Sequence, residues 1–174
     1  MATAPLADLE LLVPDCRARV LALLVACHAE GIPLEAYETG RPPARQAELY
    51  AIGREPGNGE LGHTRTDSLP WHSAHQFGLA VDLVFRVNGR WTWVEPEGGM
   101  WDRLHELAPE SGLRGLRNRR GRLIEMPHVQ LEGVGPSDLA RLPRGPNETA
   151  AWLAWQRARA AGVAPPPADP EDRG

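Results

Sequence analysis

The sequence has no lysine, only two cysteines and no long hydrophobic run. All 19 basic residues are arginines, and 23 acidic residues give a net charge of −4. This balance predicts no general attraction to nucleic acid or to an anionic membrane surface. The absence of lysine beside abundant alanine, glycine and proline is typical of a GC-rich genome and indicates nothing about function. No apolar stretch is long enough to cross a bilayer, so we expect no membrane span.

The two cysteines, Cys16 and Cys27, lie in a stretch that is predicted to be helical. On one helix they would be about 16 Å apart, which is too far for a disulfide bond. We interpret them as buried thiols in a protein that is not built around disulfides. The N-terminus has acidic residues and no basic segment before an apolar run, so no signal peptide is predicted.

What the sequence does contain is an apolar strand interrupted by one carboxylate. One face of this strand carries Leu79, Val81, Leu83 and Phe85. Gly78, Ala80 and Asp82 share the other face, where a lone carboxylate needs a partner charge or a metal ion. His75 comes just before the strand, and Gly78 lets the chain bend between them. An imidazole nitrogen and a carboxylate oxygen can therefore meet at one point, and both are good zinc ligands.

A second stretch adds another imidazole and another carboxylate. His128 opens a short alternating strand, and Pro127 excludes a helix before it, so Glu125 lies in a turn. A catalytic zinc has three protein ligands and one open position for water. We predict His75, Asp82 and His128 as the ligands of one zinc ion per chain. Glu125 is placed beside them to act as a general base.

Together these residues read Ser73-x-His75-x-x-Gly78-x-Ala80-x-Asp82, followed by Glu125-x-x-His128. This pattern resembles the zinc D-alanyl-D-alanine carboxypeptidase family of bacterial cell-wall peptidases. That family includes vancomycin-resistance D,D-peptidases and phage L-alanyl-D-glutamate endolysins, and the stretches 77–82 and 126–130 are most similar to the endolysin branch. The resemblance implies that His75, Asp82 and His128 bind zinc. It also implies that Glu125 is the catalytic base, where endolysins usually have the chemically equivalent aspartate.

The run from Glu38 to Arg54 resembles the first motif of the same family. Arg41 and Gln46 keep the spacing of that motif, in which the arginine holds the peptide substrate or the oxyanion. We therefore predict that Arg41 takes part in catalysis and that Gln46 and Ser73 contact the substrate. The alternative is that Arg41 is a solvated loop residue.

Residues 55–71 form a long glycine-containing loop that we expect to flank the cleft. His63 and His72 lie in or near this loop, and His105 lies in a predicted helix. None of the three fits the motif, so we do not expect them to bind the metal. His72 is the best substitute if the ligand set differs from the one predicted.

Two further segments each allow two interpretations. Trp91 and Trp93 follow an Asn-Gly hairpin turn and share a face, where they either line the substrate groove or pack within the sheet. Residues 114–122 include five arginines. They form either a solvated hairpin tip or a patch for anionic wall polymer or stem-peptide carboxylates.

We expect a single α+β domain over residues 1–162, in which a small antiparallel sheet bears the zinc site and helices pack on it. The motif core covers residues 32–132, and its family shares this core with lysostaphin-type peptidases and hedgehog domains. The predicted helices are 15–30, 42–53, 99–107, 136–142 and about 147–161. The last helix has Asn147 as its expected N-cap and Trp152 and Trp155 on its inner face. Residues 163–174 are predicted to be a disordered tail.

The function that the resemblance implies is zinc-dependent hydrolysis of a peptidoglycan stem peptide, as by an L-alanyl-D-glutamate endopeptidase. One alternative is a D,D-carboxypeptidase or dipeptidase that trims terminal D-alanine. Another is a non-catalytic, zinc-stabilised binding domain, which would not need Glu125. We expect a monomer that is made in the cytoplasm and reaches the cell wall after release, as in phage or prophage lysis.

Overall fold

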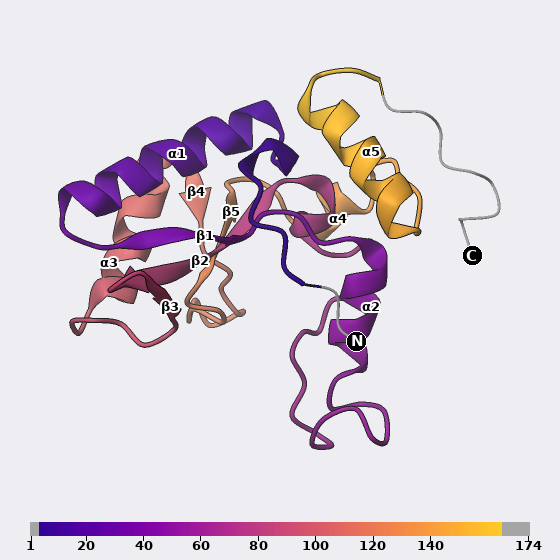
Figure 1. Ribbon diagram of the computed structural model, residues 1–174, viewed down its shortest axis with the longest axis horizontal. Coiled ribbons are helices and arrows are strands. Elements are labelled where there is room, and N and C mark those ends of the chain that lie inside the picture. The colour runs from indigo at the N-terminus through magenta and orange to yellow at the C-terminus, as the bar shows by residue number, and fades with distance from the viewer. Residues whose placement is uncertain (1–3, 165–174) are drawn as a thin grey trace.

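The computed structural model describes residues 4–164 and has the predicted α+β architecture (Figure 1). The strands are β1 (Leu34–Glu38), β2 (Ala80–Val87), β3 (Arg90–Thr92), β4 (Leu113–Arg114) and β5 (His128–Leu131). The helices are α1 (Pro14–Ala29), α2 (Pro43–Ala51), α3 (Met100–Leu107), α4 (Pro136–Leu139) and α5 (Thr149–Ala160). Short 3-10 helices are η1 (Leu9–Leu11), η2 (Ala74–Phe77) and η3 (Ala108–Ser111). No helix within residues 4–164 has the length and apolar character that a bilayer crossing needs.

Strand β2 is the centre of an antiparallel sheet with the order β1-β2-β5-β4. Strand β1 occupies one edge of β2. The other edge is shared, because β5 pairs with the beginning of β2 and β3 pairs with its end. Directly opposite residues in such pairs point to the same face of the sheet. The pair Asp82↔His128 therefore places both side chains on one face.

The opposite face of the sheet packs against α1 and α3 and forms the main core. This core includes Val20, Leu23, Leu34, Val81, Leu83, Phe85, Trp101, Leu104 and Val129. Cys16 and Cys27 are free, buried thiols in the same core, as predicted. Burial raises the pKa of the Cys27 thiol to about 11, which keeps it protonated and unreactive.

A second core lies between η2 and α5. Trp152 and Trp155 are buried there against Trp71 and Phe77, which confirms the predicted inner face of α5. The predicted N-cap was wrong by one residue. The Glu148 carboxylate accepts the Ala151 N–H, whereas Asn147 Oδ1 accepts the indole N–H of Trp71 at 2.8 Å. Most of the predicted tail, from residue 165 onward, lies outside the described residues.

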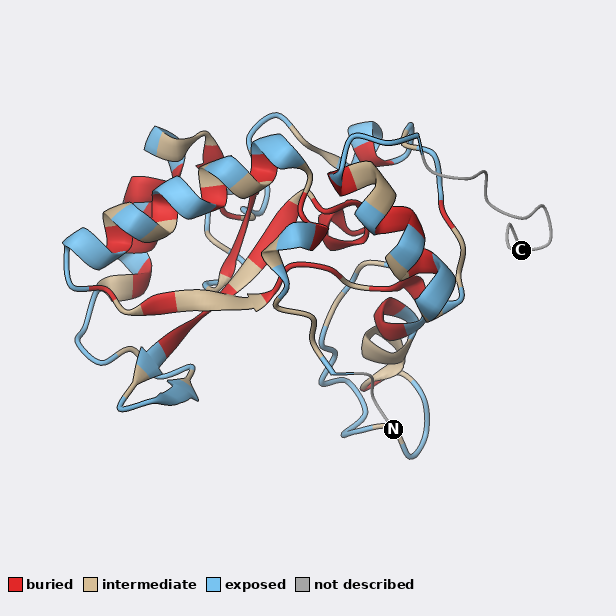
Figure 2. Cartoon of the chain, turned by 45° about the horizontal axis from the view of Figure 1, so that its top comes forward, coloured by how far each residue is buried: buried red, intermediate tan, exposed pale blue. Residues whose placement is uncertain are grey.

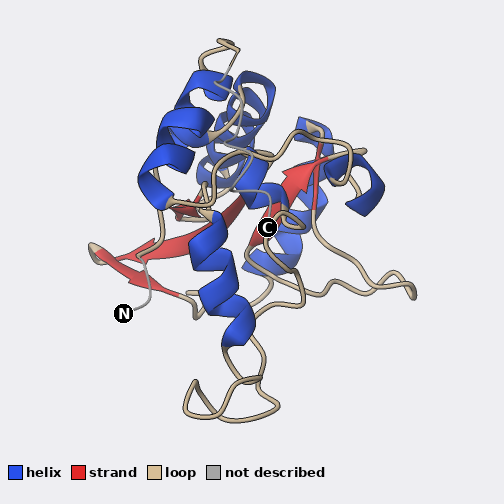
Figure 3. Cartoon of the chain, turned by 90° about the vertical axis from the view of Figure 1, so that its right-hand side faces the viewer, coloured by secondary structure: helices blue, strands red, loops and turns tan. Residues whose placement is uncertain are grey.

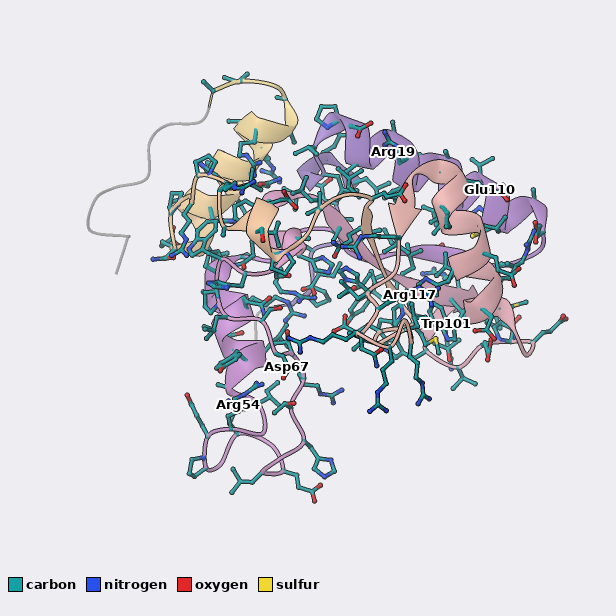
Figure 4. The ribbon with its side chains drawn as sticks, turned by 180° about the vertical axis from the view of Figure 1, so that it is seen from behind. Arg19, Arg54, Asp67, Trp101, Glu110 and Arg117 are labelled. Carbon is teal, nitrogen blue, oxygen red and sulfur yellow. The ribbon has the colours of Figure 1, made fainter. Side chains whose placement is uncertain are left out.

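Helix α2 and the loop after it extend away from the sheet (Figures 1 and 3). Arg54 closes the base of this loop, because its guanidinium donates to the carbonyl of Thr66 at 2.8 Å and to Asp67 at 2.8 Å. Figure 4 shows Arg54 and Asp67 close together at this base. The long polar segment is therefore anchored to the end of α2.

Gly78 connects η2 to β2 and is the glycine that the fold requires most clearly. Its φ is +67°, and a Cβ atom there would overlap Gln156 Nε2 and the Leu11 carbonyl oxygen. We expect Gly78→Ala to destabilise the protein by more than about 1 kcal/mol, because alanine is strained at positive φ and has no room. Gly98→Ala is the control, since Gly98 has no positive φ and no atom near its Cβ position. Equal midpoints of urea unfolding for the two variants would contradict this account.

Candidate active site

The structure brings the three predicted metal ligands together on the open face of the sheet. His75 Nε2 lies 3.1 Å from His128 Nδ1 and 3.2 Å from Asp82 Oδ1. His128 Nδ1 lies 3.1 Å from the same Asp82 oxygen. His75 comes from η2, whereas Asp82 and His128 are paired across β2 and β5. The three ligand atoms thus form a nearly equilateral triangle.

This triangle fits a tetrahedral metal ion. Zinc bonds of about 2.0–2.1 Å to nitrogen or oxygen place the ligand atoms about 3.3 Å apart in a tetrahedral site. The observed separations of 3.1 to 3.2 Å are close to that value. Two imidazoles and one carboxylate are also a ligand set that catalytic zinc sites use. The cluster of His75, Asp82 and His128 can therefore hold a metal ion.

Neighbouring side chains orient two of the three ligands. Gln130 donates through Nε2 to the Val134 carbonyl at 2.7 Å, so its Oε1 is left to accept from His128 Nε2 at 3.0 Å. The proton of His128 is thereby on Nε2, and the lone pair of Nδ1 faces the cluster. Arg41 Nη2 donates to Asp82 Oδ2 at 2.9 Å, which leaves Oδ1 for the metal.

The electrostatic environment favours the metal-binding forms of His75 and Asp82. Burial lowers the pKa of the His75 imidazole, which keeps it neutral. Burial alone raises the pKa of Asp82, but His75 and His128 outweigh it and hold this pKa well below its usual range. Burial lowers the pKa of His128, but its protonated form donates from Nδ1 to Asp82 and this more than compensates, so the net shift is upward. A metal ion at Nδ1 would displace that proton and leave the neutral form with its proton on Nε2. Asp82 is therefore ionised at neutral pH and attracts a cation.

Behind Asp82 lies a buried ionic cluster that the sequence did not reveal. Glu38 is 2% exposed and accepts hydrogen bonds from both Arg41 and Arg45. Glu38 lies opposite Asp82 in the β1–β2 pair, so two carboxylates face the same region and require cations between them. Arg41 bridges the two carboxylates, and its charge is thus largely neutralised within the protein.

We expect Arg41→Met to destabilise the protein by about 3 kcal/mol, because breaking a buried ion pair leaves uncompensated charge. The side chains of Arg41 and Glu38 are only 11% and 2% exposed. Arg103→Met is the matched control, since the Arg103–Glu30 pair is solvent-exposed and should matter little. The measurement is the free energy of unfolding of both variants in urea. Equal decreases in this free energy would show that the buried ion pairs stabilise the fold no more than the exposed pair does.

Glu125 lies beside the ligand triangle and borders an open cavity. Its Oε2 is 3.9 Å from His128 Nδ1, and its side chain is 45% exposed. A cavity of about 520 Å³ is lined by Glu125, Asp82, Arg65 and Trp93, among others. The Glu125 carboxylate can thus reach both the ligand cluster and a molecule in the cavity. Arg65 belongs to the long loop, which flanks the cleft as expected.

The other two predicted substrate contacts, Gln46 and Ser73, are buried. Gln46 accepts from Arg41 at 3.2 Å and donates to the Ser68 carbonyl at 2.6 Å, so it connects Arg41 to the long loop. Ser73 precedes η2, and its backbone N–H donates to Gln76 at 3.3 Å. The side chain of Gln46 therefore has an evident structural role, whereas the contact of Ser73 is made by its backbone. Direct contact with substrate stays a prediction for both residues.

The remaining histidines lie outside the ligand cluster. His63 and His72 are exposed, and His72 borders a separate cavity beside α2. His105 packs behind the turn that carries Glu125, where its Nε2 lies 2.8 Å from the Met126 carbonyl oxygen. The structure therefore gives no support to His72 as a substitute ligand.

A buried three-ligand cluster that faces a cavity, with a carboxylate beside it, is the arrangement of metal-dependent hydrolases. Comparison with known protein families agrees with this class, since residues 10–113 match the VanY family, described as D-alanyl-D-alanine carboxypeptidase. The match covers more than half of the sequence, so this chain belongs to the VanY family. The matched segment contains His75 and Asp82 and ends before Glu125 and His128. No curated protein sequence matches.

Solved structures confirm the fold. The LdcB LD-carboxypeptidase has a TM-score of 0.53 at 16% identity, over 88% of this chain and 65% of its own. VanYB in complex with D-alanine-D-alanine has a TM-score of 0.53 at 18% identity, and the match covers 88% of this chain and 79% of VanYB. DacB from Streptococcus pneumoniae D39 has a TM-score of 0.52 at 20% identity, and the match covers 70% of this chain and 67% of DacB. This chain thus spans less than two thirds of LdcB, and at these identities the similarity establishes the shared fold alone.

Proposed function

We propose that this protein is a zinc-dependent peptidase that cleaves the L-alanyl-D-glutamate bond in peptidoglycan stem peptides. One observation carries the proposal: the ligand atoms of His75, Asp82 and His128 lie 3.1 to 3.2 Å apart, close to the roughly 3.3 Å of a tetrahedral zinc site. The carboxylate of Glu125 lies beside this triangle at the edge of an open cavity. A binding domain stabilised by zinc would not need that carboxylate.

The chemistry follows from the positions of these residues. Bound zinc would polarise the scissile carbonyl and lower the pKa of water at the site to about 7. Glu125 takes a proton from the attacking water as the water oxygen bonds to the carbonyl carbon. Glu125 then gives this proton to the leaving nitrogen as the C–N bond breaks. Arg41 keeps Asp82 oriented throughout, and its predicted share in stabilising the oxyanion is part of the proposal.

The exposure of the cavity supports an endopeptidase that acts on a large polymer. The side chain of Glu125 is 45% exposed, and Trp93 and Ile124 at the cavity wall are 48% and 60% exposed. A cross-linked polymer can reach such a site without threading a free end into a closed pocket. The endolysin-like stretches around Asp82 and His128 favour the same bond. As part of this proposal, such an enzyme would act on the cell wall during phage or prophage lysis.

A D,D-carboxypeptidase is the second candidate, because the matched family is described by that activity. The same ligands and base would serve both reactions, and only the position of the stem peptide would differ. Digestion of purified sacculi separates the two candidates, with turbidity and the new termini followed by mass spectrometry. We expect clearing and new D-glutamate amino termini. Release of free D-alanine without clearing would replace the endopeptidase with the carboxypeptidase.

A further inference from the structure

The face of the sheet that bears the ligand cluster continues beyond it as an exposed aromatic surface. Asp82 and Arg86 alternate onto the same face of β2, and Trp91 of β3 is paired directly with Arg86. Trp91 and Trp93 are 47% and 48% exposed. Figure 2 shows the exposed β3 beside the buried middle of β2. Large aromatic groups left half in water at this place call for an explanation.

Both indoles are held in fixed orientations. The ring of Tyr37 packs edge-on against Trp91 at 5.5 Å and against Trp93 at 4.7 Å between centroids. The indole N–H of Trp91 donates to Glu35 at 3.0 Å. These contacts leave two rigid side chains that lose little further conformational freedom when a ligand packs on them. We call Tyr37, Trp91 and Trp93 the aromatic shelf.

The shelf is continuous with the candidate active site. Trp93 lines the same cavity as Asp82 and Glu125, and Trp91 packs against the same Tyr37 ring as Trp93. Arg86 is four positions along β2 from Asp82, which corresponds to roughly 13 Å at the rise of a strand. Trp91, paired with Arg86, therefore lies roughly that far along the sheet from the ligand cluster.

The polar groups at the rim of the shelf suit a sugar. Glu35 and Arg86 lie 3.7 Å apart and are 45% and 44% exposed, so they offer both an acceptor and donors for hydroxyl and acetamido groups. The electron-rich face of an indole attracts the C–H groups on one side of a pyranose ring. Exposed aromatic rings with such a polar rim are chemically complementary to an amino sugar.

We propose that the aromatic shelf binds an N-acetylated sugar of the peptidoglycan glycan strand. This inference rests on the proposed function, because the sugar is attached to the stem peptide through a lactyl group at L-alanine. From an L-alanyl-D-glutamate bond, one amino acid and the lactyl group reach the sugar in roughly 10 Å of extended chain. From a terminal D-alanyl-D-alanine bond the distance is roughly 20 Å. The roughly 13 Å to Trp91 lies between these two distances, so a sugar on the shelf does not by itself choose between the two bonds.

The first test measures binding without catalysis. The probe is the peptide-free disaccharide of N-acetylglucosamine and N-acetylmuramic acid, titrated calorimetrically into the full-length protein. We expect Trp91→Ala to weaken its affinity at least about tenfold, as for an aromatic residue central to an interface. Trp91→Phe should retain most of the affinity, because it keeps a ring for stacking. Val25→Ala is the control, since Val25 is an exposed apolar residue of α1, on the other side of the sheet.

The second test separates this inference from the proposed function. Trp91→Ala should raise KM severalfold for a stem peptide attached to the disaccharide and leave the free stem peptide unaffected. The proposal that the shelf binds a sugar would be refuted by an equal change in KM for both substrates. It would also be refuted if folded Trp91→Ala bound the disaccharide as tightly as the wild type. If the protein binds the disaccharide through Trp91 but hydrolyses neither substrate, the sugar site is supported and the proposed function is refuted.

Discussion

Replacing Glu125 by glutamine is expected to lower kcat by roughly 10² to 10⁴ while zinc stays bound, because general-base catalysis is lost. The amide keeps the size of the side chain, and Glu125 is 45% exposed, so the fold should be unaffected. The measurement is the rate of new amino termini released from a stem-peptide substrate, with zinc content determined in the same samples.

Glu132→Gln is the matched control for this experiment, since Glu132 is an exposed carboxylate just after β5 and does not line the cavity. Its turnover should equal that of the wild type. Near-normal turnover of the zinc-loaded Glu125→Gln variant would show that another group takes the proton.

Replacing His128 by alanine is expected to abolish both bound zinc and activity. His128 is 4% exposed and supplies one corner of the ligand triangle, so its loss leaves two protein ligands. Zinc affinity should fall by more than the roughly 10- to 100-fold typical of residues that only hydrogen-bond to a ligand. The same loss is expected for His75→Ala. Zinc content after dialysis against a weak chelator measures the effect.

Two other substitutions serve as controls for the zinc loss expected in His128→Ala. Gln130→Ala removes the hydrogen bonds to His128 Nε2 and to the Val134 carbonyl but no ligand atom, and should weaken zinc binding by roughly 10- to 100-fold. His72→Ala removes an exposed imidazole outside the cluster and should change nothing. Full zinc retention in a His75→Ala, His128→Ala double variant, or zinc loss in His72→Ala, would contradict the assigned ligand set.

The ligand cluster could be predicted because local rules fix its geometry. Side chains alternate between the two faces of a strand, so Asp82 lies on the face opposite to Leu83. Pro127 excludes a helix before His128, so His128 is predicted to begin a strand. The structure confirms these local features and pairs Asp82 directly with His128. The α+β class followed from the same motif and is confirmed by the sheet and its solved relatives.

Features that depend on the pairing of distant segments could not be predicted. Arg41 contacts Asp82, 41 positions away, only because β1 pairs with β2 and places Glu38 opposite Asp82. The aromatic shelf adjoins the cavity because β3 and β5 occupy the same edge of β2, which no sequence pattern indicates. The N-cap of α5 was missed because Trp71, 76 positions away, uses the side chain of Asn147.

The central claim is that one zinc ion at His75, Asp82 and His128 drives hydrolysis of a peptidoglycan stem peptide. The most direct measurement removes metal from the full-length protein and restores zinc stepwise, while new amino termini from a disaccharide-linked stem peptide are counted. The account predicts no turnover without metal, a linear rise with added zinc and a plateau at one zinc per chain. Full turnover in the metal-depleted protein, or bound zinc that restores none, would contradict it.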